Sequence, residues 1–484
     1  MDFDKAVFSI LNFQDGILNL RKFSALGLKL TIDTSANTLM YDDFFENLRN
    51  KEYSRLDKHQ HIYLDYTGGG MYAESQIEAH FALLKEKILG NPHSTNPTSQ
   101  LSTTLVAEAR QKVLDFFNAK DYYCVFTQNA SNALKIIGEC YPFNSRSHFM
   151  LLTDNHNSVN GIREFCMSKG GKVTYAPIFF DNLRIDDDFV QKELSKENIF
   201  EHKLFAFPAQ SNVSGIKHDL KWIKIAQDQG WDVLLDAAAF VPSNRLDLSA
   251  VRPDFVCVSF YKIFGYPTGL GCLLIKKDKF ETLHKPWFAG GTVSFVSVNA
   301  LHYSLMDNHE RFEDGTLNYL DIPAIKTGLE YIEKIGIEKI NNRIVSMRTY
   351  LCEELKKLKH NTGQSLIHVS GPEDNNNIGG TMIMNFYYPN GERYDFELIE
   401  ELANKNNISL RSGCFCNPGL DETNSCLTEE ELSKYYTGSK SYSYKDMEKF
   451  FGRMRGATRI SFGIATVKRD LDAFIRFASS LLDK

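Results

Sequence analysis

Short apolar runs alternate with longer amphipathic stretches between residues 120 and 276. The apolar runs, rich in β-branched and aromatic residues, predict buried strands at residues 122–126, 149–152, 204–207, 231–235, 255–259 and 272–275. Apolar positions at helical spacing predict helices at residues 75–89, 101–117, 133–138 and 221–229. This alternation of strands and helices predicts an α/β fold with a doubly wound, largely parallel sheet whose ligands lie at one edge.

The pattern changes after the last of these strands. Residues 326–360 have the spacing of a long, charged helix, and they lead into a region with shorter elements. The pattern there predicts strands near residues 381–387 and 408–410 and helices near 445–455 and 467–482. We therefore divide the chain into an N-terminal extension without an assigned role, a large domain and a smaller α+β domain, at residues 1–58, 59–330 and 331–484.

Composition narrows the classes of function. A net charge of −6 argues against nucleic-acid or anionic-membrane partners, and no apolar run reaches the about 20 residues that span a bilayer. The first residues lack the profile of a signal peptide, so we expect a cytoplasmic protein. Nine cysteines are an odd number without disulfide-framework or zinc-finger spacing, so we expect no structural metal.

A lysine lies on a Gly-rich turn between two of the predicted strands. Lys262 follows the strand at residues 255–259, and its neighbours in sequence are Phe260, Tyr261, Ile263 and Phe264. An amine that is desolvated among aromatic side chains has a lowered pKa, which a Schiff-base nucleophile requires. Alternatively, the lysine caps a loop and lays its stem along aromatic faces.

Other polar residues follow the neighbouring strands. Asp236 ends an apolar run and needs a cationic partner, which a protonated pyridine nitrogen could provide. His156 could stack on a planar ring there, or simply cap the next helix. Ala130 and Ser131 stand between a strand and a helix, where the backbone N–H groups can bind a phosphate, although a simple N-cap also fits.

Together these groups match what pyridoxal 5'-phosphate requires: donors for its phosphate, an aromatic cover, a carboxylate for the ring nitrogen and an amine for the aldehyde. From about residue 60 onward, the chain resembles the class V aminotransferase-like, fold type I pyridoxal-phosphate enzymes. Within these it is most similar to the NifS-like cysteine desulfurase domain of molybdenum cofactor sulfurases. The resemblance is carried by YLDYTG at 63–68, NPHS at 91–94, LDAAAFV at 235–241, SFYKIFGYPTGLG at 259–271, RFEDGT at 311–316 and RSGCFCNPG at 411–419.

The resemblance implies a large domain with a mostly parallel seven-stranded sheet and a homodimer. It implies that Lys262 forms the Schiff base, Asp236 holds the ring nitrogen and His156 stacks on the ring. Thr316 would be lent across the dimer interface, with Thr292 as the alternative. The residues implied for cofactor binding are Ala130, Ser131, His156, Asn212, Asp236, Ser259, Lys262 and Thr316, and those implied for substrate binding are Arg459, Arg411 and Asn212.

Two cysteines lie close together in the last motif. We expect the thiols of Cys414 and Cys416 to point to opposite sides of an extended segment, so that at most one of them faces the cofactor. The resemblance implies that this one is Cys416, which joins Lys262, His156 and Asp236 as a catalytic residue. A structural role for both cysteines is the alternative.

The resemblance therefore implies a cysteine desulfurase that takes sulfur from L-cysteine, releases alanine and leaves a persulfide on Cys416. Molybdenum cofactor sulfurases usually continue into a further domain beyond the position of Lys484, so the acceptor, a protein or molybdenum cofactor, is left open. Two other classes stay open: another class V activity (selenocysteine lyase, epimerase or aminotransferase), and a protein that has the fold and binds partners without catalysis.

Overall fold

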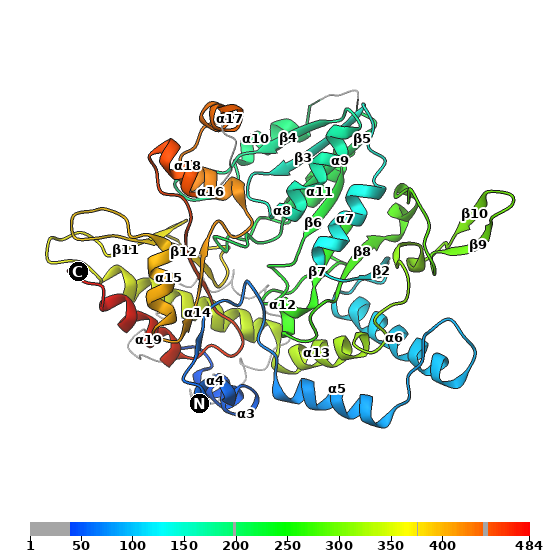
Figure 1. Ribbon diagram of the computed structural model, residues 1–484, viewed down its shortest axis with the longest axis horizontal. Coiled ribbons are helices and arrows are strands. Elements are labelled where there is room, and N and C mark those ends of the chain that lie inside the picture. The colour runs from blue at the N-terminus through cyan, green and yellow to red at the C-terminus, as the bar shows by residue number, and fades with distance from the viewer. Residues whose placement is uncertain (1–38, 197–199, 375, 439–443) are drawn as a thin grey trace, which may run out of the picture. The chain divides into compact units, whose positions relative to one another are not determined.

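A seven-stranded sheet forms the centre of the computed structural model, which describes residues 39–196, 200–374, 376–438 and 444–484. The strand order is β2 (Tyr122–Thr127), β8 (Gly271–Lys276), β7 (Phe255–Ser259), β6 (Asp232–Asp236), β5 (His202–Pro208), β3 (Ser147–Leu152) and β4 (Lys172–Ala176). Strand β8 runs antiparallel to both of its neighbours, and the other strands run parallel to one another. The predicted α/β fold with a largely parallel sheet is confirmed (Figure 1).

Apolar side chains on both faces of this sheet are buried under helices. In β3, for example, Phe149 and Leu151 pack into one core and Met150 and Leu152 into the other. One face is covered by α7 (Ala130–Cys140) and α9 (Ile162–Ser168), and the other by α6 (Pro97–Phe116), α11 (Lys221–Asp228) and α13 (Ile322–Ile335). Burial on both faces explains why the strands are continuous apolar runs in the sequence.

The apolar pattern located most of the strands but missed β4. Of its residues only Ala176 is fully buried, because β4 is an edge strand that pairs with β3 alone. An edge strand buries less of its surface, so its sequence, Lys-Val-Thr-Tyr-Ala, lacks the apolar run that marked the central strands.

A second, antiparallel sheet lies in the C-terminal part of the chain. Its strand order is β11 (Ile367–Ser370), β12 (Thr381–Phe386), β15 (Ala457–Ser461) and β14 (Arg411–Gly413). The helices of this region are α14 (Ile337–Lys356), α15 (Phe396–Asn404), α16 (Pro418–Asn424), α17 (Glu429–Gly438), α18 (Tyr444–Phe451) and α19 (Lys468–Ser479).

The predicted long helix within residues 326–360 and the predicted strand near 408–410 are confirmed, and the structure adds a detail to each. The stretch at residues 326–360 contains two helices, α13 and α14, which Gly336 separates. The strand predicted at 408–410 is β13 (Ile408–Ser409), which pairs in parallel with β1 (Ile62–Tyr63) outside the second sheet. A strand as short as β13 takes its partner from the tertiary fold, which the local pattern does not contain. Residues 39–484 form one compact unit, and the proposed division near residue 330 stays a prediction.

The remaining elements connect these layers. They are α3 (Asp42–Glu52), α4 (Ser54–Lys58), α5 (Glu74–Glu86), α8 (Asn157–Asn160), α10 (Asp187–Leu194), α12 (Phe260–Phe264), the 3₁₀ helices η2 (Lys277–Thr282) and η3 (His309–Phe312), and the hairpin β9 (Val293–Ser297) and β10 (His302–Leu305). None of the helices that the structure describes has the length and apolar character for a membrane span.

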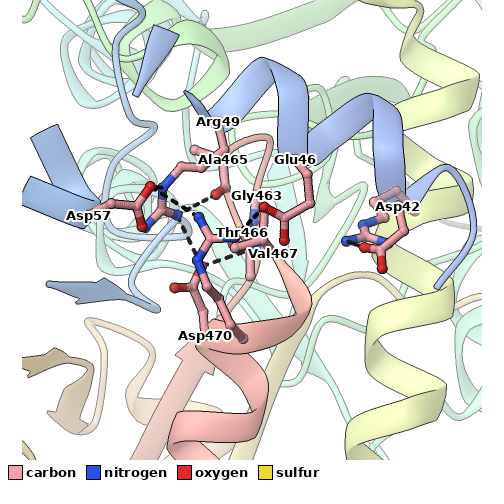
Figure 2. Close-up of polar contacts among 11 residues, drawn as sticks. Asp42, Glu46, Arg49, Asp57, Gly463, Ala465, Thr466, Val467 and Asp470 are labelled. Atoms are coloured by element: carbon pink, nitrogen blue, oxygen red, sulfur yellow. Dashed lines mark hydrogen bonds and ion pairs between the residues drawn. The ribbon is translucent and has the colours of Figure 1, made fainter. Parts of the chain in front are cut away.

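The predicted N-terminal extension, residues 1–58, lies partly outside the described residues, which begin at Leu39. Its described part is held to the end of the chain by Arg49 on α3, whose side chain is buried (Figure 2). The Arg49 guanidinium donates to both carboxylate oxygens of Asp57 (3.2 and 3.0 Å), to Asp470 Oδ2 (3.0 Å) and to the carbonyl oxygen of Ala465 (2.6 Å). Burial raises the pKa of Asp470, and the Arg49 charge opposes that effect.

We expect Arg49→Met to lower the free energy of unfolding by about 3–5 kcal/mol, because it leaves the buried Asp470 carboxylate without its cationic partner. Urea unfolding of the purified protein measures the change. The matched control is Arg469→Met, since Arg469 also pairs with Asp57 (3.0 Å) but its side chain is 46% exposed; it should cost less than about 1 kcal/mol. Equal, small effects of the two variants would show that Arg49 does not anchor α3.

Candidate active site

Lys262 lies on α12, the short helix that begins directly after β7. The helix ends at Gly265, whose φ of 82° is left-handed and whose added Cβ would collide with the backbone of Tyr72. Only glycine fits this position, and it turns the chain back into β8. Burial lowers the pKa of Lys262, and the Asp236 carboxylate partly opposes the shift. The predicted desolvated amine is therefore present in the fold.

A cavity of about 250 Å³ lies in front of Lys262, at the carboxyl ends of the parallel strands. Most of the residues that the sequence predicted for the cofactor line it together: Ala130, Ser131, His156, Asn212, Asp236, Ser259 and Lys262, with Gln210 beside them. Segments far apart in the sequence meet here because parallel strands end at a common sheet edge.

One end of the cavity is formed by the first turn of α7. The backbone N–H of Ala130 donates to Ser259 Oγ (2.9 Å), and the hydroxyls of Ser131 and Ser158 are hydrogen-bonded to each other (2.6 Å). The N-cap of α7 is Asn129, whose side chain accepts from Asn132 N (2.9 Å). Asn129, and not Ala130 or Ser131, therefore caps the helix. The hydroxyls of Ser131, Ser158 and Ser259 lie around the N-terminus of α7, where the positive end of the helix dipole favours an anion.

Asp236 stands at the other side of the cavity, at the end of β6. Its Oδ1 accepts hydrogen bonds from Ala238 N (3.0 Å) and from the Cys257 thiol (3.4 Å), which fix the carboxylate. Among the described residues, Asp236 and Lys262 form no direct ion pair, so the space between them can receive a ligand.

His156 caps a helix and also lines the cavity, while its stacking on a planar ring stays a prediction. Its side chain caps α8, because Nδ1 accepts from Ser158 N (3.1 Å), and its ring also lines the cavity. Burial lowers the pKa of His156, and the nearby Lys262 and Arg459 charges act in the same direction. A neutral imidazole is a suitable cover for an aromatic ring.

Asp65 joins two arginines beside the cavity, a role that the sequence did not reveal. The Arg411 guanidinium binds Asp65 Oδ2 through Nε (3.0 Å) and Nη2 (2.7 Å), and Arg459 donates to Asp65 Oδ1 (2.9 Å). Arg459 is only 3% exposed and also donates to the carbonyl oxygen of Asn212 (2.8 Å), while its buried Nε–H has no hydrogen-bond partner. It is therefore an interior arginine with spare donor capacity.

The segment that carries Cys414 and Cys416 differs from the prediction. We assumed an extended strand, but β14 ends at Gly413, and Phe415 and Cys416 both have left-handed φ values, 57° and 55°. The prediction that the two thiols point to opposite sides is therefore wrong on two counts: side chains two residues apart on a strand point to the same side, and this segment is not a strand. Cys416 is exposed, and its thiol lies close enough to Arg411 and Arg459 to interact electrostatically with both. Burial lowers the pKa of Arg459, whereas the hydrogen bond to Asp65 raises the pKa of Arg411.

Thr316 is not brought to the cavity of its own chain. It lies on the exposed loop after η3, whereas Thr292 is buried and hydrogen-bonded to the backbone of Ala289 (3.0 Å). The role of Thr316 across a dimer interface stays a prediction. Within the described part of the chain, no cluster of three or more His, Cys, Asp or Glu side chains is arranged to hold a metal ion.

Comparison with known proteins identifies similar sequences. The model of the family "Aminotransferase class-V" matches residues 62–474. Molybdenum cofactor sulfurase from Solanum lycopersicum is 36% identical over 469 residues, which cover 90% of this chain and 57% of that protein. The Homo sapiens protein of the same name is 34% identical and is covered to 52%. The chain thus spans little more than half the length of these relatives.

Solved structures show the same fold. The apo structure of cysteine desulfurase from Thermococcus onnurineus NA1 has a TM-score of 0.75 at 24% identity, covering 90% of this chain and 98% of that one. Cysteine desulfurase CsdA from Escherichia coli has a TM-score of 0.71 at 20% identity and is covered to 99%. The predicted fold type I architecture is confirmed by these likenesses, and so is the resemblance to class V aminotransferase-like proteins.

We expect Asp236→Asn to lower the pKa of Lys262 further, because the variant removes the carboxylate that favours the charged ammonium. Acylation of Lys262 in the cofactor-free protein, followed against pH by peptide mass spectrometry, measures the midpoint. The control is Asp232→Asn, at the opposite end of the same strand, where the carboxylate pairs with Lys279 (2.6 Å). Equal midpoints for Asp236→Asn and the unchanged protein would contradict the expectation.

Proposed function

Because the chain belongs to the aminotransferase class-V family, we propose that it is a pyridoxal-phosphate-dependent cysteine desulfurase. It would take sulfur from L-cysteine, release alanine and hold the sulfur as a persulfide on Cys416. One observation carries this proposal: a cavity that holds a desolvated amine, a fixed carboxylate and a helix N-terminus lies close to a loop with an exposed thiol.

The residues around the cavity fit pyridoxal phosphate. Lys262 would hold its aldehyde carbon, Asp236 its ring nitrogen and His156 one face of its ring. The hydroxyls and the N–H groups at the start of α7, from Ala130, Ser131 and Ser259, would receive the phosphate, and Asn212 would lie near the ring hydroxyl. When bound, pyridoxal phosphate supplies an electron sink for bond changes at the substrate's carbon atoms.

Two arginines would bind the substrate's carboxylate. Arg459 keeps a buried Nε–H without a partner, so it can accept a carboxylate in addition to Asp65. Arg411 is shared between Asp65 and the solvent, and it lies on the strand that leads into the cysteine loop. The lowered pKa of Lys262 would let its neutral amine move the proton at Cα of the bound amino acid.

Cys416 would then take the sulfur. Its thiolate forms an S–S bond with the sulfur of the bound cysteine, and the Cβ–S bond of the substrate breaks. The bonding electrons stay with the substrate's carbon skeleton, which gains a proton and leaves as alanine, while a persulfide remains on Cys416. The guanidinium groups of Arg411 and Arg459 lie near Cys416, so the sulfur transfer would take place beside two positive charges.

The acceptor of this sulfur would be a separate protein or cofactor. Transfer to molybdenum cofactor is suggested by the names of the relatives, although the chain spans only 57% and 52% of their lengths. We also propose a cytoplasmic homodimer that supplies Thr316 across its interface. The cytoplasmic location is supported by the cysteines, since all nine are free thiols. The homodimer is supported by the β9–β10 hairpin, which exposes Phe295, Val298 and Leu301, apolar side chains that a second copy of the chain could cover.

Incubation of the pyridoxal-phosphate-loaded protein with L-cysteine should give alanine and protein-bound persulfide in equal amounts. Cys416→Ser should lower both by at least about 100-fold, since it removes the nucleophile, whereas Cys414→Ser should keep them near the original rate. Lys262→Ala should remove the visible absorption of the bound cofactor.

The same experiment separates the alternative functions. Full persulfide formation by Cys416→Ser would refute Cys416 as the nucleophile. Conversion of another amino acid without alanine release from cysteine would indicate a different class V activity. Absence of any visible absorption after added pyridoxal phosphate would favour a protein that has the fold without the chemistry.

A further inference from the structure

The loop that carries the exposed thiol is held against the large sheet by a buried polar cluster, which consists of Asp154, Ser211, His218 and Asn417. None of these residues lines the cavity in front of Lys262. Asp154, Ser211 and His218 follow strands β3 and β5, whereas Asn417 follows Cys416 directly in the sequence. The cluster therefore connects the strand ends of the sheet with the cysteine loop.

Asp154 is the centre of this cluster and has no exposed surface. Its Oδ1 accepts from Asn417 Nδ2 (2.6 Å) and from Ser211 Oγ (2.9 Å), and its Oδ2 lies 3.2 Å from His218 Nε2. A buried carboxylate with three donors is well satisfied, and a hydrogen bond to a charged acceptor is stronger than one between neutral groups. Asn417 is itself only 1% exposed, so water does not compete for this bond.

Further bonds hold the backbone of the loop on either side of the thiol. Asn212 Nδ2 donates to the carbonyl oxygen of Phe415 (2.8 Å), and the Asn157 N–H donates to the carbonyl oxygen of Cys416 (2.7 Å). Asn417 also donates to Asn212 Oδ1 (3.1 Å). Just beyond the loop, a Cβ at Gly419 would collide with the carbonyl oxygen of Thr153, so the chain there lies directly on the end of β3.

This attachment explains how two left-handed residues persist in succession. Phe415 and Cys416 both adopt a backbone conformation that is unfavourable for side chains with a Cβ. Such conformations are kept only where surrounding contacts determine them. The contacts here come from both sides of the loop, and Asn417 supplies the most deeply buried of them.

We propose that Asp154 is a positioning residue for sulfur transfer: through Asn417 it holds the loop so that Cys416 faces the substrate, without touching substrate or cofactor itself. The inference rests on the proposed cysteine desulfurase function. It gives a role in sulfur transfer to the buried Asp154 carboxylate, which does not line the cavity in front of Lys262. It also implies that changes at Asp154 slow the transfer of sulfur more than the binding of L-cysteine.

Three variants test this task. Asp154→Asn removes the charged acceptor, and Asn417→Asp places a second carboxylate opposite Asp154 while keeping an oxygen to accept from Leu420 N (3.2 Å). The double variant, Asp154→Asn with Asn417→Asp, restores an amide and a carboxylate with their positions exchanged. The control is Asp247→Asn, which removes a similar contact at the surface, to Asn118 Nδ2 (2.8 Å).

Two readouts are compared in the loaded protein. The first is the alkylation rate of Cys416 by iodoacetamide, resolved by peptide mass spectrometry, with exposed Cys426 as the internal reference. The second is the single-turnover rate of persulfide formation, set beside the change in cofactor absorption when L-cysteine binds. Each single variant should alter the Cys416 alkylation rate and lower the persulfide rate by about tenfold, while the absorption change and Cys426 labelling stay the same.

The double variant should recover both rates to within about threefold of the unchanged protein, and Asp247→Asn should leave them unaltered. The proposal is overturned if both single variants keep Cys416 alkylation and persulfide formation at the original rates, or if the double variant is no better than the worse single one. If iodoacetamide also labels buried Cys257 in a single variant, that variant has unfolded. The proposal is then judged from the rates of the double variant alone. If no variant forms persulfide but alkylation of Cys416 still follows this pattern, the loop contact stands and the proposed function fails.

Discussion

One carboxylate, Asp65, determines how the parts of the candidate site meet. Two guanidinium groups approach it, and without it the buried Arg459 would lose its carboxylate partner while the positive charge of Arg411 stayed beside it. Because β1 pairs with β13, the segment before Asp65 also fixes the strand that leads to the cysteine loop. The ion triad thus connects Arg459, the strand before the cysteine loop and the segment that contains Asp65.

Much of the fold could be predicted from the sequence, because the central strands are buried on both faces and are therefore continuous apolar runs. The residues at their ends, Lys262, Asp236 and His156, could be predicted as neighbours since parallel strands end at a common edge. The edge strand β4 was missed because its burial is partial. The pairing of β13 with β1 was missed because two-residue strands carry almost no pattern.

The polar contacts around the cysteine loop could not be predicted from the sequence. Asp154, Ser211 and Asn417 stand next to residues that were recognised, His156, Asn212 and Cys416, yet nothing local indicates that they meet. Their hydrogen bonds span 57 and 263 residues. The left-handed conformation of Phe415 and Cys416 was equally hidden, because neither residue type favours it and only tertiary contacts impose it.

The position of Arg49 has a consequence for how the chain is made. Its partner Asp470 lies 421 residues later, so a helix near the start of the described residues completes its ion pairs only after those residues have been made. At ribosomal rates of about 5–20 residues per second, this delay is on the order of half a minute or more. During that time Asp57 is the only one of the three acceptor residues of the Arg49 guanidinium that has been made, so α3 reaches its final contacts long after its own synthesis.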